Sequence, residues 1–279
     1  MELYRYKAYA ETTYVAPANA REDRLRDCDA LLKRIESSVD GPRRRLLDVG
    51  CSVGELIGVA QRRGWSCTGI EVDPSTAQLA RELTHADVRV GTVPAVLRQS
   101  DTFDLVVMSH SLEHSRAPRE DFDAAVSHLR DGGLLFIRAP NASSQTARCM
   151  GSSWYWFIPP LHVSYFDMAS LRYVADQASL RDVWLEYRGE GWAWFLFEIA
   201  ETPARLAYRR RPSVGEREDE IHVGSQGPPA HKTASNLRAL LEDRLVRHGV
   251  RLIPFRSAAA LANDSEFLNL LRKPPVEAR

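Results

Sequence analysis

The sequence has 279 residues, of which 44% are hydrophobic and 27% charged, as in an ordinary globular protein. Its 37 Lys and Arg residues balance its 37 Asp and Glu residues, which disfavours nucleic acid or an anionic membrane as partner and favours a small neutral or zwitterionic ligand. The four cysteines, never spaced as CxxC, predict neither a zinc site nor a disulfide framework. Because we find no basic and apolar leader and no apolar run that could span a bilayer, we expect a cytoplasmic protein.

Strand-like and helix-like segments alternate along the first two thirds of the chain. Pro74 opens one predicted helix, Gly132 and Gly133 close the helix before the fifth strand, and Asp167 caps another. Continuous apolar strands separated by helices are typical of a parallel sheet covered on both faces, which binds ligands beyond the carboxyl ends of its strands. The predicted strands are 45–50, 66–72, 87–91, 103–109, 134–141 and 183–188.

The segments on either side of this core have different patterns. We expect an N-terminal cap segment with a helix around residues 27–37, and a closing strand near the C-terminus. Polar loops and helix-like segments before that strand predict a helical insertion, which is either a lid or a helical pair that covers the sheet. The predicted division is 1–40 for the N-terminal segment, 41–190 for the core, 191–262 for the insertion and 263–279 for the closing strand and tail.

The run LLDVGCSVGE, residues 46–55, ends an apolar strand with a carboxylate and two glycines. A dinucleotide site needs the spacing GxGxxG, which Gly50 and Gly54 do not have, and Asp48 would repel the pyrophosphate. A cationic ligand reverses this preference. Glu71 ends the next strand, where a second acid can accept hydrogen bonds from ribose hydroxyls. The pattern therefore favours S-adenosylmethionine, which carries a sulfonium, an ammonium and no phosphate.

Four runs, LLDVGCSVGE, GIEVDP, FDLVVMSHSLEH and LLFIRAPN, occur in this order and spacing. Together they resemble the class I S-adenosylmethionine-dependent methyltransferases, in the branch with an LEH segment after the fourth strand. The run NDSEFLNLLRKP, from Asn263, resembles that branch's closing strand, and residues 139–171 resemble its bacterial small-molecule enzymes. The resemblance implies an α/β fold with a Rossmann-like, doubly wound, seven-stranded sheet. That sheet would be mostly parallel, with an antiparallel last strand and a helical insertion.

The resemblance also implies which residues hold S-adenosylmethionine. It places the glycine turn under the methionine part, Glu71 on the ribose and Val72 against the adenine. Ser52 replaces a more usual glycine and Thr92 replaces an acid that often meets the adenine amine, so we expect both to weaken the affinity for the cofactor. The implied cofactor-binding residues are Asp48, Gly50, Cys51, Gly54, Glu71, Val72, Gly91, Thr92, Ser109 and His110.

A hydroxyl or carbon-acid acceptor must lose a proton, and histidine is the natural base near neutral pH. We expect His162 to act as base or substrate ligand and His110 to contact the substrate or the cofactor. His114 is expected either to take part in the chemistry or to be a structural link at a helix start. Aromatic residues after the fifth strand are expected to shape an apolar acceptor pocket. The predicted substrate-binding residues are Trp154, Trp156, Tyr165 and Asn141.

The resulting hypothesis is an S-adenosylmethionine-dependent methyltransferase that methylates an oxygen atom of a small, specialised metabolite. It would use no metal, nucleic acid or membrane, and it could form a homodimer. Two alternatives stay open: N- or C-methylation of a small molecule, including sugars and amines, and a catalytically silent protein that binds the cofactor. A nucleic-acid methyltransferase is disfavoured because no basic face is evident, and a dehydrogenase is disfavoured by the turn spacing.

Overall fold

The computed structural model describes residues 18–39, 41, 44–188 and 266–275. The chain forms two compact units, and the first unit holds nearly all of the sheet. The predicted insertion lies outside the described residues, so its role as a lid stays a prediction. The first unit comprises Met1–Pro140, Pro160–Glu186 and Phe267–Arg279, and the second comprises Asn141–Pro159 and Tyr187–Glu266.

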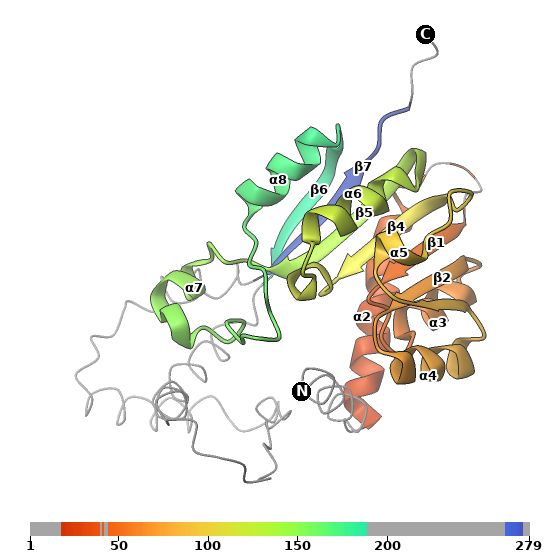
Figure 1. Ribbon diagram of the computed structural model, residues 1–279, viewed down its shortest axis with the longest axis horizontal. Helices are drawn as coiled ribbons and strands as arrows, with labels where there is room; N and C mark the ends of the chain where they lie inside the picture. Colours follow the sequence, from red (N-terminus) through yellow and green to blue (C-terminus); the bar gives the residue numbers. More distant parts are fainter. Residues whose placement is uncertain (1–17, 40, 42–43, 189–265, 276–279) are drawn as a thin grey trace. The chain divides into compact units, whose positions relative to one another are not determined.

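The sheet has seven strands in the order β3-β2-β1-β4-β5-β7-β6 (Figure 1). The pairings from β3 across to β5 are all parallel, and β7 is antiparallel. The structure therefore confirms the predicted Rossmann-like, mostly parallel sheet with its antiparallel last strand. The strands are β1 Arg45–Val49, β2 Ser66–Glu71, β3 Asp87–Val90, β4 Phe103–Ser109, β5 Leu129–Pro140, β6 Arg181–Arg188 and β7 Glu266–Arg272.

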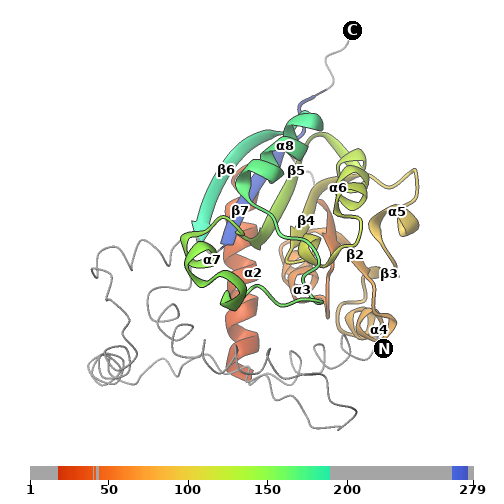
Figure 2. The same cartoon turned by 60° about the vertical axis from the view of Figure 1, so that its left-hand side comes forward.

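Helices cover both faces of the sheet (Figures 1 and 2). One buried cluster joins α2, α3 and α4 to the sheet, and a second cluster joins α5, α6 and α8 to it. None of the described helices is both long and apolar enough to cross a membrane. The helices are α2 Ala18–Glu36, α3 Glu55–Arg62, α4 Pro74–Thr84, α5 Val93–Val96, α6 Pro118–Ser127, α7 Gln145–Met150 and α8 Met168–Gln177, with 3-10 turns η1 Leu112–His114 and η2 Gly151–Ser153.

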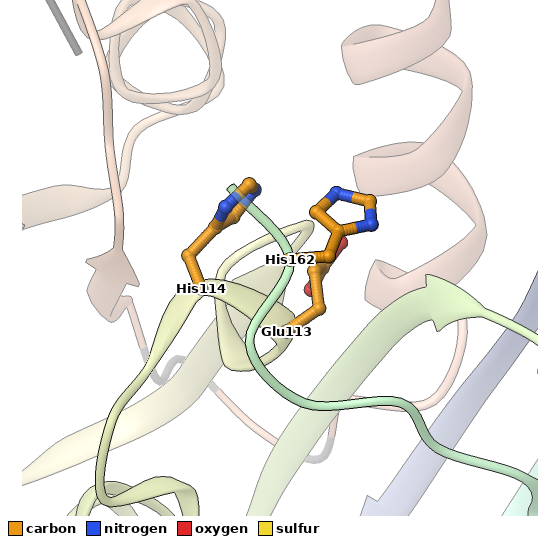
Figure 3. A group of neighbouring side chains, drawn as sticks. All are labelled: Glu113, His114 and His162. Atoms are coloured by element: carbon orange, nitrogen blue, oxygen red, sulfur yellow. The ribbon is translucent and has the colours of Figure 1, made fainter. Parts of the chain in front are cut away.

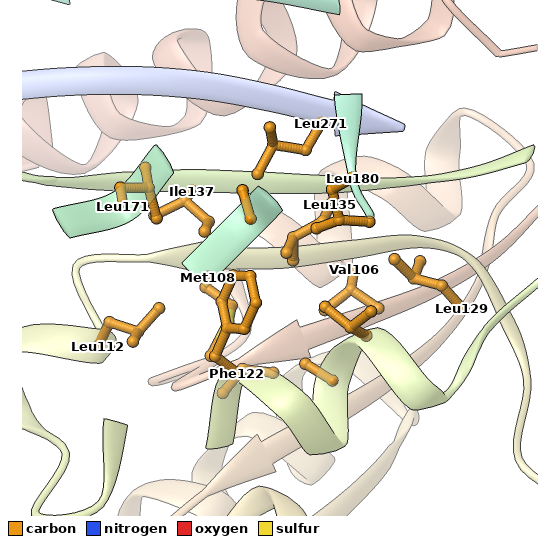
Figure 4. Close-up of a cluster of buried hydrophobic side chains, with 14 of the residues drawn as sticks. Val106, Met108, Leu112, Phe122, Leu129, Leu135, Ile137, Leu171, Leu180 and Leu271 are labelled. Atoms are coloured by element: carbon orange, nitrogen blue, oxygen red, sulfur yellow. The ribbon is translucent and has the colours of Figure 1, made fainter. Parts of the chain in front are cut away.

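Strand β4 shows why the core strands have continuous apolar sequences. Successive side chains of a strand point to opposite faces, and both faces are buried here. Val106 and Met108 pack with Phe122 of α6 (Figure 4), whereas Leu105 and Val107 belong to the cluster on the other face. Each such side chain contributes roughly 1.5–3 kcal/mol when fully buried.

The predicted end of α6 at the double glycine is wrong. The helix ends at Ser127, and Gly132 and Gly133 lie inside β5. The register with β4 is shifted there, as at a bulge, and both glycines exchange 2.9 Å backbone hydrogen bonds with Lys273, just after β7. A pair of glycines is common both at the end of a helix and at a bulge in a strand. The local sequence therefore does not distinguish the two, and the pairing with the distant residue Lys273 does.

The predicted bounds of the N-terminal helix are also wrong. We expected a helix around residues 27–37, but α2 begins at Ala18 and ends at Glu36. The charged first half of α2 hides its helical periodicity, and ion pairs such as that between Arg24 and Glu55 of α3 stabilise it. The predicted starts of α4 and α8 are confirmed, because Pro74 begins α4 and Asp167 caps α8 by accepting a hydrogen bond from the Ser170 N–H.

Candidate active site

The turn between β1 and α3 lies at the carboxyl end of the sheet. Gly50 has a φ of 73° and Ser52 a φ of 53°, so both adopt the left-handed conformation. A Cβ atom on Gly50 would lie 2.8 Å from the Cβ of Ser111, in the loop after β4. The turn is therefore packed closely against that loop, and Ser52 occupies a conformation that favours glycine.

Glu71 connects this turn to the end of β2. Its Oε2 accepts a hydrogen bond from the Ser52 N–H at 3.0 Å, and its Oε1 accepts from the N–H groups of Val72 and Asp73 at 2.8 and 3.1 Å. A carboxylate offers about four lone-pair positions, so acceptor capacity remains for a ribose hydroxyl. Burial raises the pKa of Glu71, and the three backbone hydrogen bonds oppose that rise.

Asp48, at the end of β1, is only 5% exposed. Burial, and secondarily the negative charge of Glu71, raises the pKa of Asp48 to about 7. No hydrogen-bond donor to its carboxylate is found among the described residues. A cation placed beside this pair of acids would stabilise the ionised form of Asp48. The residues present therefore fit a ligand with the sulfonium and ammonium groups of S-adenosylmethionine.

The ends of β2 and β3 present exposed apolar groups. Val72 is 52% exposed and Val90 is 38% exposed. Gly91, directly after β3, has a φ of 145°, and its N–H donates to the carbonyl of Glu71 at 3.0 Å. Thr92 is the N-cap residue of α5, and its side chain makes no capping hydrogen bond. This exposed apolar surface is suited to the face of an aromatic ring, and we expected the adenine there.

The loop after β4 carries His110 in a strained conformation. His110 has a φ of 51°, and its Nδ1 lies 3.1 Å from Oε1 of Glu113, which is buried. Burial raises the pKa of Glu113, but the hydrogen bond and charge of His110 and the charge of His114 outweigh it, so the pKa is lowered. The Oγ of Ser111 is buried without a hydrogen-bond partner among the described residues. Ser111 was missed from the sequence, because only the fold places it against Gly50.

The loop between η2 and α8 is hydrogen-bonded to η1. The carbonyl of Glu113 accepts from the N–H groups of Val163 and Ser164 at 2.9 and 3.1 Å, and His114 Nδ1 lies 2.9 Å from the carbonyl oxygen of Leu161. These bonds bring His162 to His114, with ring centroids 4.8 Å apart. His162 is buried, at 3% exposure.

The predicted substrate residues fall in different units. Tyr165 lies in the first unit, where its hydroxyl donates to the carbonyl of His162 at 3.2 Å. In the second unit, Asn141 and Trp154 are buried, and Trp156 packs edge-on against Tyr155. The Asn141 Oδ1 accepts from the Ser143 N–H and hydroxyl at 3.2 and 3.0 Å, which ties it to local structure. A common acceptor pocket for these four predicted residues therefore stays a prediction.

Comparison with known proteins identifies the family. The family described as "Methyltransferase domain" matches residues 20–184, which is more than half of the chain.

The chain belongs to the methyltransferase domain family. The expected fold of the class I S-adenosylmethionine-dependent methyltransferases agrees with this family and with the order of the strands in the sheet. The finer assignment to the LEH branch remains a prediction.

Solved structures that the chain resembles support the fold. A SAM-dependent methyltransferase from Archaeoglobus fulgidus is 17% identical with a TM-score of 0.55, and the match covers 89% of this chain and 94% of that one. A putative sarcosine dimethylglycine methyltransferase from Galdieria sulphuraria is 14% identical with a TM-score of 0.56, covering 91% and 88%.

Curated relatives match a shorter part of the chain. A ubiquinone biosynthesis O-methyltransferase of Xanthomonas campestris is 33% identical over 116 residues, or 39% of this chain and 48% of that protein. One of Rhizobium johnstonii is 30% identical over 110 residues, or 37% and 44%. The chain thus spans about half the length of the curated relatives that it matches.

Proposed function

We propose that this methyltransferase transfers a methyl group from S-adenosylmethionine to a hydroxyl oxygen of a small molecule, as a member of the LEH-containing bacterial branch. The observation that carries the proposal is the buried acid pair, Asp48 and Glu71, at the ends of β1 and β2 beside a glycine turn. The O-methyltransferase names of the curated relatives support oxygen as the acceptor atom. A specialised metabolite as substrate remains part of the proposal.

Each part of the site has a separate role in this proposal. Asp48 attracts the cationic methionine part, Glu71 accepts hydrogen bonds from the ribose, and Val72 covers the adenine. Bound S-adenosylmethionine supplies a methyl group that its sulfonium already activates. The chain must then align the acceptor and withdraw its proton. We assign this task to His110, which Glu113 orients, and to the neighbouring histidines His114 and His162.

The first experiment is calorimetric titration with S-adenosylmethionine and S-adenosylhomocysteine, with NADH as control. The acid pair and the turn spacing lead us to expect binding of both sulfur nucleotides and none of NADH. Mass spectrometry of phenol, alcohol and amine acceptors incubated with the cofactor then identifies the methylated atom. Binding without turnover on any acceptor would favour the silent cofactor-binding protein, and methylation of amines alone would favour an N-methyltransferase.

The affinity for S-adenosylmethionine should depend on pH through Asp48. Below the pKa of about 7, the cationic cofactor must displace the proton of this carboxyl group. The Kd should therefore fall by about tenfold per pH unit as the pH rises toward 7, and level off above it. Calorimetry in buffers of different ionisation enthalpy should show release of close to one proton per cofactor at pH 6. A Kd that is flat from pH 5.5 to 7 would contradict the role given to Asp48.

A further inference from the structure

Glu113, His114 and His162 form a compact group that we call the Glu-His-His cluster (Figure 3). Each of the three residues offers one potential metal ligand, and these ligand atoms all lie within 4.8 Å of one another. Glu113 and His162 are buried and His114 is half-buried. Glu113 and His114 come from η1 and His162 from the loop between η2 and α8, all within the first unit.

Glu113 has an oxygen that the protein leaves unsatisfied. Its Oε1 is close to His110 Nδ1, but its Oε2 is buried without a hydrogen-bond partner among the described residues. A buried carboxylate oxygen without a donor is costly and calls for an explanation, such as an ion. Because Glu113 is only 1% exposed, bulk water does not supply that partner.

His114 is held in the way that metal-binding histidines are held. His114 Nδ1 lies 2.9 Å from the carbonyl oxygen of Leu161, and a carbonyl only accepts, so the proton resides on Nδ1. The lone pair of Nε2 is then available to a metal, with the carbonyl as the outer partner that fixes the ring. The ring of His162 approaches that of His114 at an interplanar angle of 72°.

We propose that the Glu-His-His cluster binds one divalent metal ion of the Zn²⁺ class through Glu113, His114 and His162. Two imidazoles and one carboxylate are a ligand set that such ions favour, and three protein ligands leave a position open for a substrate oxygen. Ligand atoms around tetrahedral Zn²⁺ lie roughly 3.3 Å apart. Side-chain rotations must therefore bring these ligand atoms closer together than their present separations of up to 4.8 Å. The sequence predicted no metal, because His162 is distant from Glu113 and His114 along the chain.

The ion would change how the acceptor is activated. This consequence rests on the proposed function, whereas metal binding itself does not. The cluster lies at the carboxyl ends of β4 and β5, where the acceptor hydroxyl is expected. A metal bound there would coordinate the hydroxyl oxygen and favour its deprotonated form, and the proton would pass to His110, the base of the proposed function. His162 would then be a ligand of the metal and not the free base.

The test is metal binding by the whole chain after treatment with EDTA. Calorimetric titration with Zn²⁺, and metal analysis of the protein after desalting, should both show one ion per chain. Thermal unfolding should show a higher Tm with the ion than without it. Co²⁺ used as a spectroscopic probe should give the intense visible bands of a four-coordinate site. Glu113→Gln and His162→Ala should each weaken Zn²⁺ binding by about 100-fold or more, while far-UV circular dichroism reports whether they are folded.

Two control variants separate the cluster from adventitious zinc binding. His85→Asn removes an exposed histidine at the end of α4, and Cys149→Ser removes an exposed thiol. Both variants should bind Zn²⁺ as the unmodified chain does. Binding that disappears in Cys149→Ser, or that survives in folded Glu113→Gln, would overturn the proposal, as would the absence of any Zn²⁺ or Co²⁺ binding.

A second measurement separates this proposal from the proposed function. Titration with S-adenosylmethionine is repeated on the EDTA-treated and the Zn²⁺-loaded protein. Cofactor binding without any metal binding would reject the metal site and leave the methyltransferase proposal standing. Metal binding at the cluster, with no cofactor binding by either the EDTA-treated or the Zn²⁺-loaded protein, would support the metal site and reject the methyltransferase proposal.

Discussion

Asp48→Asn should make the cofactor-free protein more stable at pH 8 and at the same time abolish its binding of S-adenosylmethionine. The native pKa of Asp48 is raised to about 7 by burial and by Glu71. In the unfolded chain the same group titrates near the ordinary value of about 4. Folding at pH 8 therefore forces an ionised carboxylate into a buried position. Asparagine has nearly the same shape and carries no charge.

The sign of the pH dependence follows from the raised pKa. Below about pH 4, the carboxyl group is protonated in both the folded and the unfolded protein. The charge of Asp48 then causes no difference in stability between the unmodified protein and Asp48→Asn. As the pH rises toward 7, only the unfolded protein loses the proton, and the free energy of unfolding falls. Above pH 7 the folded protein loses the proton as well, and the free energy of unfolding falls no further through this group. The stabilisation by Asp48→Asn should thus grow between pH 4 and 7 and reach roughly 2–4 kcal/mol at pH 8.

Thermal unfolding of both proteins from pH 4 to pH 8 gives the stability half of this prediction. Calorimetric titration gives the binding half, in which the variant should bind S-adenosylmethionine at least about 100-fold more weakly, because its cationic part loses the carboxylate partner. Such a gain in stability with a loss of function is expected where a buried charge is retained for a ligand. A variant that is less stable at pH 8, or one that still binds the cofactor normally, would refute the role assigned to Asp48.

Gly50→Ala should be strongly destabilising for two separable reasons. Gly50 has a φ of 73°, which disfavours any residue with a Cβ by about 1–2 kcal/mol. In addition, the new Cβ would lie 2.8 Å from the Cβ of Ser111, and such overpacking typically costs about 1–3 kcal/mol. We expect a total loss of about 2–5 kcal/mol, together with a displaced loop after β4 and weaker cofactor binding.

Gly64→Ala is a matched control for the backbone part of this effect. Gly64 has a φ of 84°, but a Cβ there meets nothing within 4 Å. Urea unfolding of Gly50→Ala and Gly64→Ala should therefore differ by the packing part alone. Adding Ser111→Gly to Gly50→Ala should restore that part, because it removes the clashing Cβ. Equal losses in the two single variants would show that the turn and the loop after β4 are not in the tight contact described.

Local sequence determined much of this protein. Continuous apolar strands, the start of α4 at Pro74 and the cap of α8 at Asp167 are short-range features, so the sheet and most element positions could be predicted. The acid at the end of β1 and the acid at the end of β2 could be paired on the same grounds. In a parallel sheet, the carboxyl ends of neighbouring strands necessarily lie side by side at the same edge of the sheet.

Tertiary structure decided what depends on contacts between distant segments. Gly132 and Gly133 belong to β5 because Lys273 pairs with them, and no local pattern carries that information. Ser111 lies against the glycine turn, and His162 reaches His114, only because two loops cross the same sheet edge. The pKa of Asp48 likewise arises from burial that the sequence does not state. The sequence therefore determined the fold and predicted a cationic ligand, whereas the packed loops decided which side chains meet at the site.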